Sequence, residues 1–172
     1  MASPNYDRIL SFSQKNDPVA IQALLAAGVP PTHTNGVGQS GIHISALWGN
    51  VDALLTLLDV IPKNDPFLNS QNKISGATAL HCAARSNKDV EGRRECVRIL
   101  VEWGADPNIL DSYGDSASSY TDDEEIRRLL GGASLQLHEL VRTDDIEKLE
   151  GCIKEVGEDM IKLLEVRRQT FL

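Results

Sequence analysis

Three histidines and one cysteine are the residues of this chain with the clearest capacity for metal chemistry: His43, His81, Cys82 and His138. Imidazole nitrogen and thiolate sulfur are the usual ligands of zinc. Zinc sites that can be recognised in a sequence bring two closely spaced ligand pairs together, and the pair His81-Cys82 has no second pair at such a spacing. The pattern therefore predicts neither a metal site nor a bound cofactor.

An acidic run at residues 122–125 and the thiol of Cys96 are the other candidates for chemistry. No glycine-rich calcium-binding loop surrounds the acids. A solvated helix over residues 123–130, capped by Asp122, is the stronger interpretation. The arginines at 93–94 would favour a Cys96 thiolate, but a half-buried structural thiol explains the position better. The sequence shows no motif of a nucleophile, a phosphate-binding loop or a zinc hydrolase, so we predict no catalytic residues and no enzyme activity.

The composition narrows the class of function. The chain has 172 residues, 41% hydrophobic and 24% charged, with a net charge of −8. The acidic composition argues against nucleic-acid binding, which needs basic patches, whereas the charge suits a basic protein partner or simple solubility. No apolar run reaches the roughly 20 residues that cross a bilayer, and the first residues form no secretory signal. Three widely spaced cysteines indicate no disulfide framework, so we expect the cytoplasm or the nucleus.

The elements that must position these residues follow from an internal repeat. Gly38, Gly76 and Gly114 recur at a step of 38 residues, and a constant step of this size is typical of stacked repeats. Matching segments follow the first two glycines, Gly-Gln-Ser-Gly-Ile-His-Ile-Ser-Ala at 38–46 and Gly-Ala-Thr-Ala-Leu-His-Cys-Ala-Ala at 76–84. Each segment predicts a turn in which glycine adopts positive φ, followed by a capped short helix.

This pattern resembles the ankyrin repeat, whose usual form is about 33 residues long with a G-x-T-P-L-H-x-A-A core. The resemblance implies an all-α fold, a solenoid of stacked helix pairs with short β-hairpin-like turns, here of four to five units. Ankyrin repeats are expected over residues 6–132, and a degenerate further repeat or a C-terminal helical extension over 133–172. The expected units are residues 6–32, 33–68, 69–108 and 109–132.

The resemblance also implies a structural role for the histidines. In the family, the matching side chain hydrogen-bonds the backbone in the turns and ties neighbouring units together. The residues expected to be structural in this way are His43, His81, His138, Gly38, Gly76 and Gly114.

Residue spacing sets further expectations for individual helices. Val19 should line the second helix of unit one. Residues 87–95 should form a polar insertion between the two helices of unit three. Ser118-Ser119 replaces the usual Leu-His of the family, so the inner helix of unit four should be short. Trp103, at the end of an outer helix, should pack under the next hairpin.

One set of residues is predicted to bind a partner. Leu47 and Trp48 fall on inner-helix positions that face the concave groove in the family, and tryptophan is enriched in binding hot spots. Packing of Trp48 against the next unit is an equally good interpretation. With the matching positions of the next unit and the hairpin tips, the expected partner-binding residues are Leu47, Trp48, Ile74, Ser75, Arg85, Ser86, Ser112 and Tyr113.

Three functions are compatible with these observations. The first is a non-catalytic protein–protein interaction module that binds a partner protein through the groove and the hairpin tips. The second is an acidic assembly chaperone for a basic client protein. The third is a regulatory or targeting domain of a larger protein whose enzymatic part lies outside this chain. The last residues, Thr170-Phe171-Leu172, resemble the opening of another repeat, so we expect the natural chain to continue.

Overall fold

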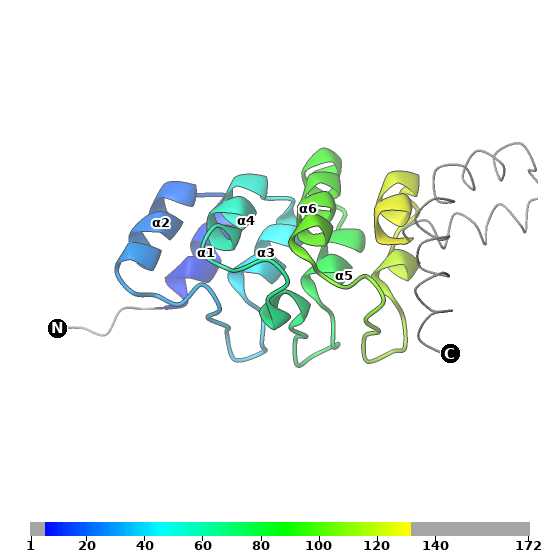
Figure 1. Cartoon of the computed structure of the whole chain (residues 1–172), viewed down its shortest axis with the longest axis horizontal. Coiled ribbons are helices and arrows are strands. Elements are labelled where there is room, and N and C mark those ends of the chain that lie inside the picture. The colour runs from blue at the N-terminus through cyan, green and yellow to red at the C-terminus, as the bar shows by residue number, and fades with distance from the viewer. Residues whose placement is uncertain (1–5, 132–172) are drawn as a thin grey trace, which may run out of the picture. The chain divides into compact units, whose positions relative to one another are not determined.

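The protein is a stack of helix pairs, as shown by a computed structural model that describes residues 6–131 (Figure 1). Its elements are α1 (Arg8–Lys15), α2 (Pro18–Ala26), α3 (Gly41–Trp48), α4 (Val51–Leu58), the 3-10 helix η1 (Pro66–Asn69), α5 (Ala79–Ala84), α6 (Val90–Trp103), the 3-10 helix η2 (Ala117–Tyr120) and a helical segment over 124–131. Within this part of the chain, β-pairing is limited to two isolated bridges, Thr34 with Ser40 and Leu110 with Ser116. The predicted all-α class is confirmed.

The helix pairs follow one another in sequence order. α1, α3 and α5 pack side by side as an inner layer, and α2, α4 and α6 form the outer layer. Each inner helix also packs against the outer helix that follows it. The turns between successive pairs project together along the lower side of Figure 1. None of the described helices has the length and apolarity that crossing a bilayer requires.

Local signals explain where the first helices begin and end. Asp17 accepts a hydrogen bond from the backbone N–H of Ala20 at 3.0 Å, and Pro18 occupies the first position of α2, where a missing N–H costs nothing. Gly28 then ends the helical run with a left-handed φ of 86°. The expectation for Val19 was wrong: its side chain is 74% exposed. Val19 lies on the solvent side of α2, the first outer helix of the described residues.

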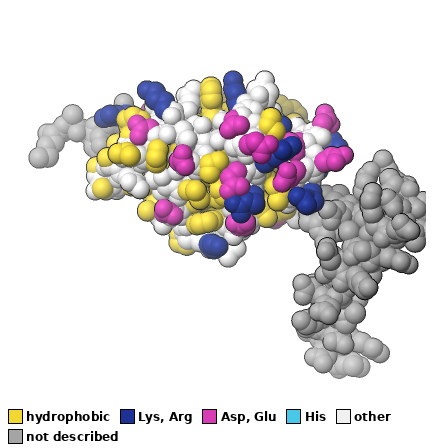
Figure 2. Space-filling model, turned by 90° about the horizontal axis from the view of Figure 1, so that it is seen from above, with side chains coloured by type: hydrophobic (Ala, Val, Ile, Leu, Met, Phe, Trp, Pro, Cys, Tyr) yellow, Lys and Arg dark blue, Asp and Glu magenta, His cyan; other side chains and the backbone are white. Residues whose placement is uncertain are grey.

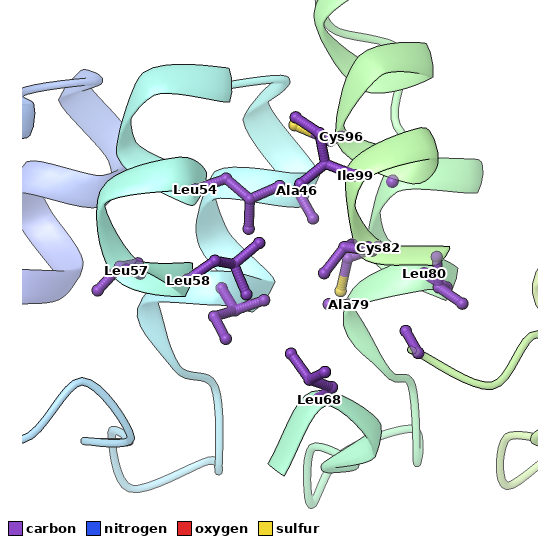
Figure 3. Close-up of a cluster of buried hydrophobic side chains, with 14 of the residues drawn as sticks. Ala46, Leu54, Leu57, Leu58, Leu68, Ala79, Leu80, Cys82, Cys96 and Ile99 are labelled. Carbon is purple, nitrogen blue, oxygen red and sulfur yellow. The ribbon is translucent and has the colours of Figure 1, made fainter. Parts of the chain in front are cut away.

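The hydrophobic core lies between the two layers and is mainly aliphatic. Figure 3 shows its central part, where side chains from α3, α4, α5, α6 and η1 meet. Leu54, Leu57 and Leu58 of α4 are fully buried there, and Leu68 of η1 covers the core from the side of the turns. Alanines such as Ala46 on the inner helices allow their backbones to approach closely.

Residues 87–95 are not simply an insertion loop, because α6 already begins at Val90 and runs for 14 residues. Glutamate and arginine are good helix formers despite their polarity, so the polar composition extends the helix. The additional turn packs against the end of α3, where Gly92 contacts the carbonyl of Gly49. A side chain at Gly92 would collide with that carbonyl.

Trp103 packs against the preceding unit, so the expectation that it lies under the next hairpin was wrong. Its indole Nε1 donates a hydrogen bond to the carbonyl of Ile61 at 3.3 Å, and the Lys63 ammonium lies 4.9 Å from the ring centroid. The N–H of Asn64 donates to the Trp103 carbonyl at 2.7 Å. The longer loop after α4 therefore reaches forward and holds the end of α6.

The fourth described pair is shorter than the others. Its inner helix is only the 3-10 helix η2, as the serines of that segment predicted. Asp123 caps the following helix, since its Oδ1 accepts hydrogen bonds from the N–H groups of Glu125 and Ile126, both at 3.1 Å. Asp122 was the expected cap, but it is exposed and pairs with Arg127 at 3.0 Å. The predicted extension over 133–172 lies outside the described residues.

Replacement of Leu80 by alanine should destabilise the fold strongly. Leu80 is 1% exposed, so truncation leaves a cavity and should lower the free energy of unfolding by about 2–5 kcal/mol. Val19→Ala is the matched control, because an exposed aliphatic side chain should change this free energy by no more than about 0.5 kcal/mol. Urea unfolding monitored by circular dichroism measures both. Equal losses in the two variants would contradict the assignment of the core.

Candidate functional site

The three turns between the pairs share one construction. In each, a side-chain oxygen accepts the backbone N–H of the residue two positions later, at 3.1, 3.0 and 2.8 Å. This local bond makes a compact turn without help from the rest of the chain. The accepting residues are Asn35, Asn72 and Asp111, and the residues held at the tips are Val37, Ile74 and Tyr113.

Neighbouring turns are joined by their backbones. The N–H of Lys73 donates to the Val37 carbonyl, and the N–H of Ser112 donates to the Ser75 carbonyl, both at 2.9 Å. Gly38, Gly76 and Gly114 all have left-handed φ angles, of 77°, 66° and 84°. At Gly76 an added Cβ would also lie only 2.7 Å from the hydroxyl of Ser112. The three tips therefore form a row whose spacing the backbone fixes.

A buried histidine ties unit two to unit three. Nδ1 of His43 accepts a hydrogen bond from the backbone N–H of Ser40 at 3.3 Å and contacts the Ser40 hydroxyl at 2.8 Å. Because Nδ1 is an acceptor, Nε2 carries the proton and donates to the carbonyl of Ser70 at 3.0 Å. The imidazole thus joins the start of α3 to the segment that leads into the next turn.

His81 makes the same tie one unit further along. Its Nδ1 accepts from the N–H of Thr78 at 3.3 Å, and its Nε2 donates to the carbonyl of Asp115 at 3.0 Å. Both imidazoles use their two nitrogens in these bonds, which leaves neither free for a metal ion. Within residues 6–131, no group of three His, Cys, Asp or Glu side chains is arranged to hold a metal. His138 lies outside the described residues.

The two cysteine thiols within the described residues are structural. Cys82 is buried, and burial raises the pKa of its thiol to about 11. Cys96 is also buried completely rather than half-buried, and its pKa is raised to about 12 by burial and then by the nearby carboxylates of Glu95 and Asp89. The alternative of an activated Cys96 thiolate is therefore wrong. The neighbouring Arg94 binds Asp123 instead, at 2.9 Å.

The predicted partner-binding residues divide into exposed and buried positions. Ile74 and Tyr113 are 70% and 74% exposed at the tips. Arg85 and Ser112 are exposed as well, and Leu47 and Trp48 are half-buried at the end of α3. Ser75 and Ser86 are buried. The Ser75 carbonyl joins two turns, and the Ser86 hydroxyl donates to the Leu47 carbonyl at 2.6 Å.

Trp48 also contacts a residue that sequence reasoning did not single out. The ammonium of Lys88 lies 4.7 Å from the centroid of the indole ring, a cation–π arrangement. Lys88 belongs to the segment taken as a polar insertion, and only the bend of that segment back towards α3 brings it to Trp48. The fold therefore assembles a surface from Leu47, Trp48, Arg85 and Lys88, which we call the inner-helix surface.

A second unpredicted contact supports the Tyr113 tip. The hydroxyl of Tyr120 donates a hydrogen bond to Oδ2 of Asp111 at 2.6 Å. This bond raises the pKa of Tyr120 to about 12. Together with the N–H bonds of the turn, it lowers the pKa of Asp111 despite the opposing effect of burial. No sequence motif links these two residues, and η2 alone brings the phenol over the turn.

Comparison with known proteins agrees with this architecture. The sequence model of ankyrin repeats, described as three copies, matches residues 10–111. The chain is 36% identical over 98 residues to the E3 ubiquitin-protein ligase KEG of Arabidopsis thaliana, in an alignment covering 56% of this chain and 5% of the ligase. It is 36% identical over 64 residues to ankyrin repeat domain-containing protein 40 of mouse and of human, covering 37% of this chain and 16% of each relative.

The chain spans only a small part of the length of each relative. The three copies found within residues 10–111 leave the expected count of four to five units a prediction.

The stability of the protein should fall in mild acid because of His43. Burial lowers the pKa of this imidazole, and the opposing hydrogen bonds to the backbone of Ser70 and Ala77 do not restore it. The unfolded chain therefore binds the proton first. The contribution of His43 is complete above the ordinary histidine pKa of about 6.5 and is lost as the pH falls towards the lower folded-state value.

Comparison of wild type with His43→Gln isolates this effect. Free energies of unfolding from urea titrations at about pH 7.5 and about pH 5.5 should fall more in wild type than in the variant. Asp111 does not interfere, because its lowered pKa makes its contribution disappear only below about pH 4. Equal pH dependence in the two proteins would contradict the buried neutral imidazole.

Proposed function

The chain belongs to the ankyrin-repeat family, and we propose that it is a non-catalytic module that binds a partner protein through its hairpin tips and its inner-helix surface. Ankyrin repeats generally mediate protein–protein interaction, and their repeats are typically not catalytic. The proposal adds to this the particular residues that make the contact. It is carried by one observation: large apolar side chains stand exposed on turns that are themselves held by backbone bonds.

The tips supply rigid apolar contacts. Ile74 and Tyr113 are among the most exposed large hydrophobic residues of the described chain. An exposed apolar side chain on a mobile loop would lose conformational entropy on binding, whereas these turns are already ordered. Val37, at the corresponding position of the preceding turn, extends the same row. A partner lying across the turns would therefore meet apolar side chains at regular intervals.

The inner-helix surface supplies a second contact region. Leu47 and Trp48 keep part of their surfaces open to solvent, and aromatic residues of this kind contribute most strongly to protein interfaces. Ser75 and Ser86 were expected to take part, but their burial assigns them to internal bonds. The proposal therefore rests on the other six residues of the predicted set: Leu47, Trp48, Ile74, Arg85, Ser112 and Tyr113.

Two alternatives differ in how much supports them. A regulatory or targeting domain of a larger protein is favoured by the relatives, since the chain aligns with 5% of a ubiquitin ligase and 16% of two other ankyrin-repeat proteins. An acidic chaperone for a basic client would draw on the acids at 122–125. Three of these carboxylates already pair with arginines, Asp122 with Arg127, Asp123 with Arg94 and Glu125 with Arg128, which weakens the field available to a client.

Alanine substitution in the proposed surface should reduce binding without unfolding the protein. Peptides selected from a displayed random library against the full chain provide the probes. Trp48→Ala and Tyr113→Ala should each weaken binding of these peptides by about 1–2 kcal/mol, while the helical signal and melting midpoint stay near wild type. Val19→Ala, an exposed aliphatic change on α2, is the control and should leave binding unchanged. If Trp48→Ala unfolds the protein, Trp48 is a packing residue and the surface is misassigned.

The chaperone alternative makes a separate prediction about charge. Asp122→Asn, Glu124→Gln and Glu125→Gln together remove the exposed acids and spare Asp123, which caps the following helix. If a basic client is the partner, this triple variant should bind a poly-lysine probe more weakly than wild type does. Added salt should weaken the binding of wild type in the same way, because it shortens the Debye length to about 8 Å. Binding that responds to neither salt nor the three substitutions would remove this alternative.

A further inference from the structure

Charge is distributed very unevenly over this acidic chain. Its net charge is −8, yet α1, α3, α5 and η2 contain no aspartate or glutamate. Arg8 and Lys15 lie in α1, Arg85 directly follows α5, and Lys88 lies in the loop after it. The inner helices themselves therefore carry only cations, whereas the acids begin in the segments that follow them, at Asp17, Asp89 and Asp122.

The basic residues of the outer layer and of the last helical segment already have partners. Arg94 binds Asp123 at 2.9 Å, Arg127 binds Asp122 at 3.0 Å, and Arg128 lies 3.6 Å from Glu125. Arg98 pairs with two glutamates of α6, Glu95 and Glu102. Within these pairs the charges largely cancel. Figure 2 views the side opposite the turns of Figure 1, where the inner helices also end, and acidic and basic side chains lie intermixed over part of this face.

The cations of the inner layer differ in this respect. Among the described residues, no carboxylate lies within 4.0 Å of Lys15, Arg85 or Lys88, although all three side chains are exposed. Two acids stand at the starts of the outer helices without forming an ion pair with these cations. Asp52 accepts a hydrogen bond from Asn16 at 3.2 Å, and Asp89 directly follows Lys88 and precedes α6.

The three cations lie in one row with the apolar residues. Lys15 and Trp48 are the last residues of α1 and α3, and Arg85 directly follows α5. These helices pack side by side, so their ends lie next to one another. The Ser86 hydroxyl bond to the Leu47 carbonyl and the stacking of Lys88 over Trp48 connect the α5 end to the α3 end. Unpaired positive charge therefore flanks an apolar centre made by Leu47 and Trp48.

We propose that the inner-helix surface, together with Lys15 of α1, binds an acidic segment of the partner protein, with an apolar side chain against Leu47 and Trp48 and carboxylates against Lys15, Arg85 and Lys88. This inference rests on the proposed function and adds the chemistry of the partner. Complementary charge steers association and excludes partners of the wrong sign. It also makes the basic client unsuited to this surface, because lysines and arginines would meet like charges.

A protein segment fits the surface better than a nucleic acid does. Nucleic-acid affinity depends on neutralising several phosphates at once, typically about 6–10 for a specific complex. The row offers three unpaired cations within a chain of net charge −8, and long-range repulsion would oppose a polyphosphate. Separated carboxylates around one apolar anchor match both the number of cations and the presence of Trp48.

Three displayed peptide libraries test the inference on the full chain. The three libraries have the same peptide length and the same apolar content. At the remaining positions, one library carries Asp and Glu, the second carries Lys and Arg, and the third carries uncharged polar residues. The acidic library should yield the tightest binders. Arg85→Glu and Lys88→Glu should each weaken them about fivefold or more, and raised salt should slow their association with wild type. Arg98→Glu, on the outer layer, is the matched control and should leave their binding unchanged.

The outcomes separate this inference from the function on which it rests. A peptide with lysines in place of its acids should bind the Arg85→Glu, Lys88→Glu double variant better than wild type, which only direct charge pairing explains. If peptides whose binding depends on Trp48 come equally from the uncharged or basic libraries, the proposal of an acidic partner is wrong. The proposal of a binding module is then unaffected. Failure of all three libraries to give Trp48-dependent binders would overturn both. A single-stranded DNA probe that displaces the acidic peptides at equal concentration would also overturn the inference.

The variants Arg85→Glu and Lys88→Glu should leave the fold intact, because neither side chain makes a strong contact within the described chain. Arg85 and Lys88 are exposed and make no ion pair within the described chain, and the cation–π contact of Lys88 is of the weak, exposed kind. Helical signal and urea midpoint should therefore match wild type. If either variant unfolds, the salt dependence of the wild-type association rate decides the question alone: independence of salt overturns the acidic partner.

Discussion

The fold depends on hydrogen bonds that cross from unit two to unit three and from unit three to the next pair through buried imidazoles. His43 reaches the carbonyl of Ser70 and His81 reaches that of Asp115, both at 3.0 Å. A single helix pair cannot bury its own apolar faces, so it is stable only when its neighbours are held at a fixed distance and angle. The imidazole supplies this constraint from inside, since its other nitrogen is fixed at the start of its own helix. The turns then line up, and their backbones bond to one another.

Two departures from strict repetition reinforce the same stack. The loop after α4 is long enough for Ile61 and Asn64 to bond the end of α6 around Trp103. The start of α6 is extended by a turn that packs on Gly49 through Gly92. That extension also carries Lys88 back to Trp48 and Arg94 forward to Asp123. One polar segment therefore shapes the inner-helix surface on one side and balances charge with the following helix on the other.

The separation of charge gives the molecule two different surfaces. On the outer layer each arginine named above has a carboxylate near it, so the surface is solvated without a strong preference for either sign of charge. On the inner layer Lys15, Arg85 and Lys88 have no carboxylate partner among the described residues, and Lys88 stacks on the half-buried Trp48. Net charge alone would direct attention to basic partners, whereas the local distribution at the proposed contact favours acidic ones. Local charge decides here because screening limits an exposed charge to about 8 Å at physiological salt.

The sequence by itself determined the repeat and its chemistry. The recurring glycines, the segments around His43 and His81 and the aliphatic spacing predicted an all-α stack and its turns, because each of these depends on contacts close in sequence or repeated from unit to unit. What it did not determine is which side of a helix the neighbouring unit covers. Val19 is exposed on α2, Trp103 packs against the preceding unit rather than the next one, and Asp123 rather than Asp122 caps the helical segment over 124–131. The contacts of Lys88 with Trp48 and of Tyr120 with Asp111 also join residues that no local pattern links. Only tertiary structure decided these points, because each depends on where loops of irregular length return the chain.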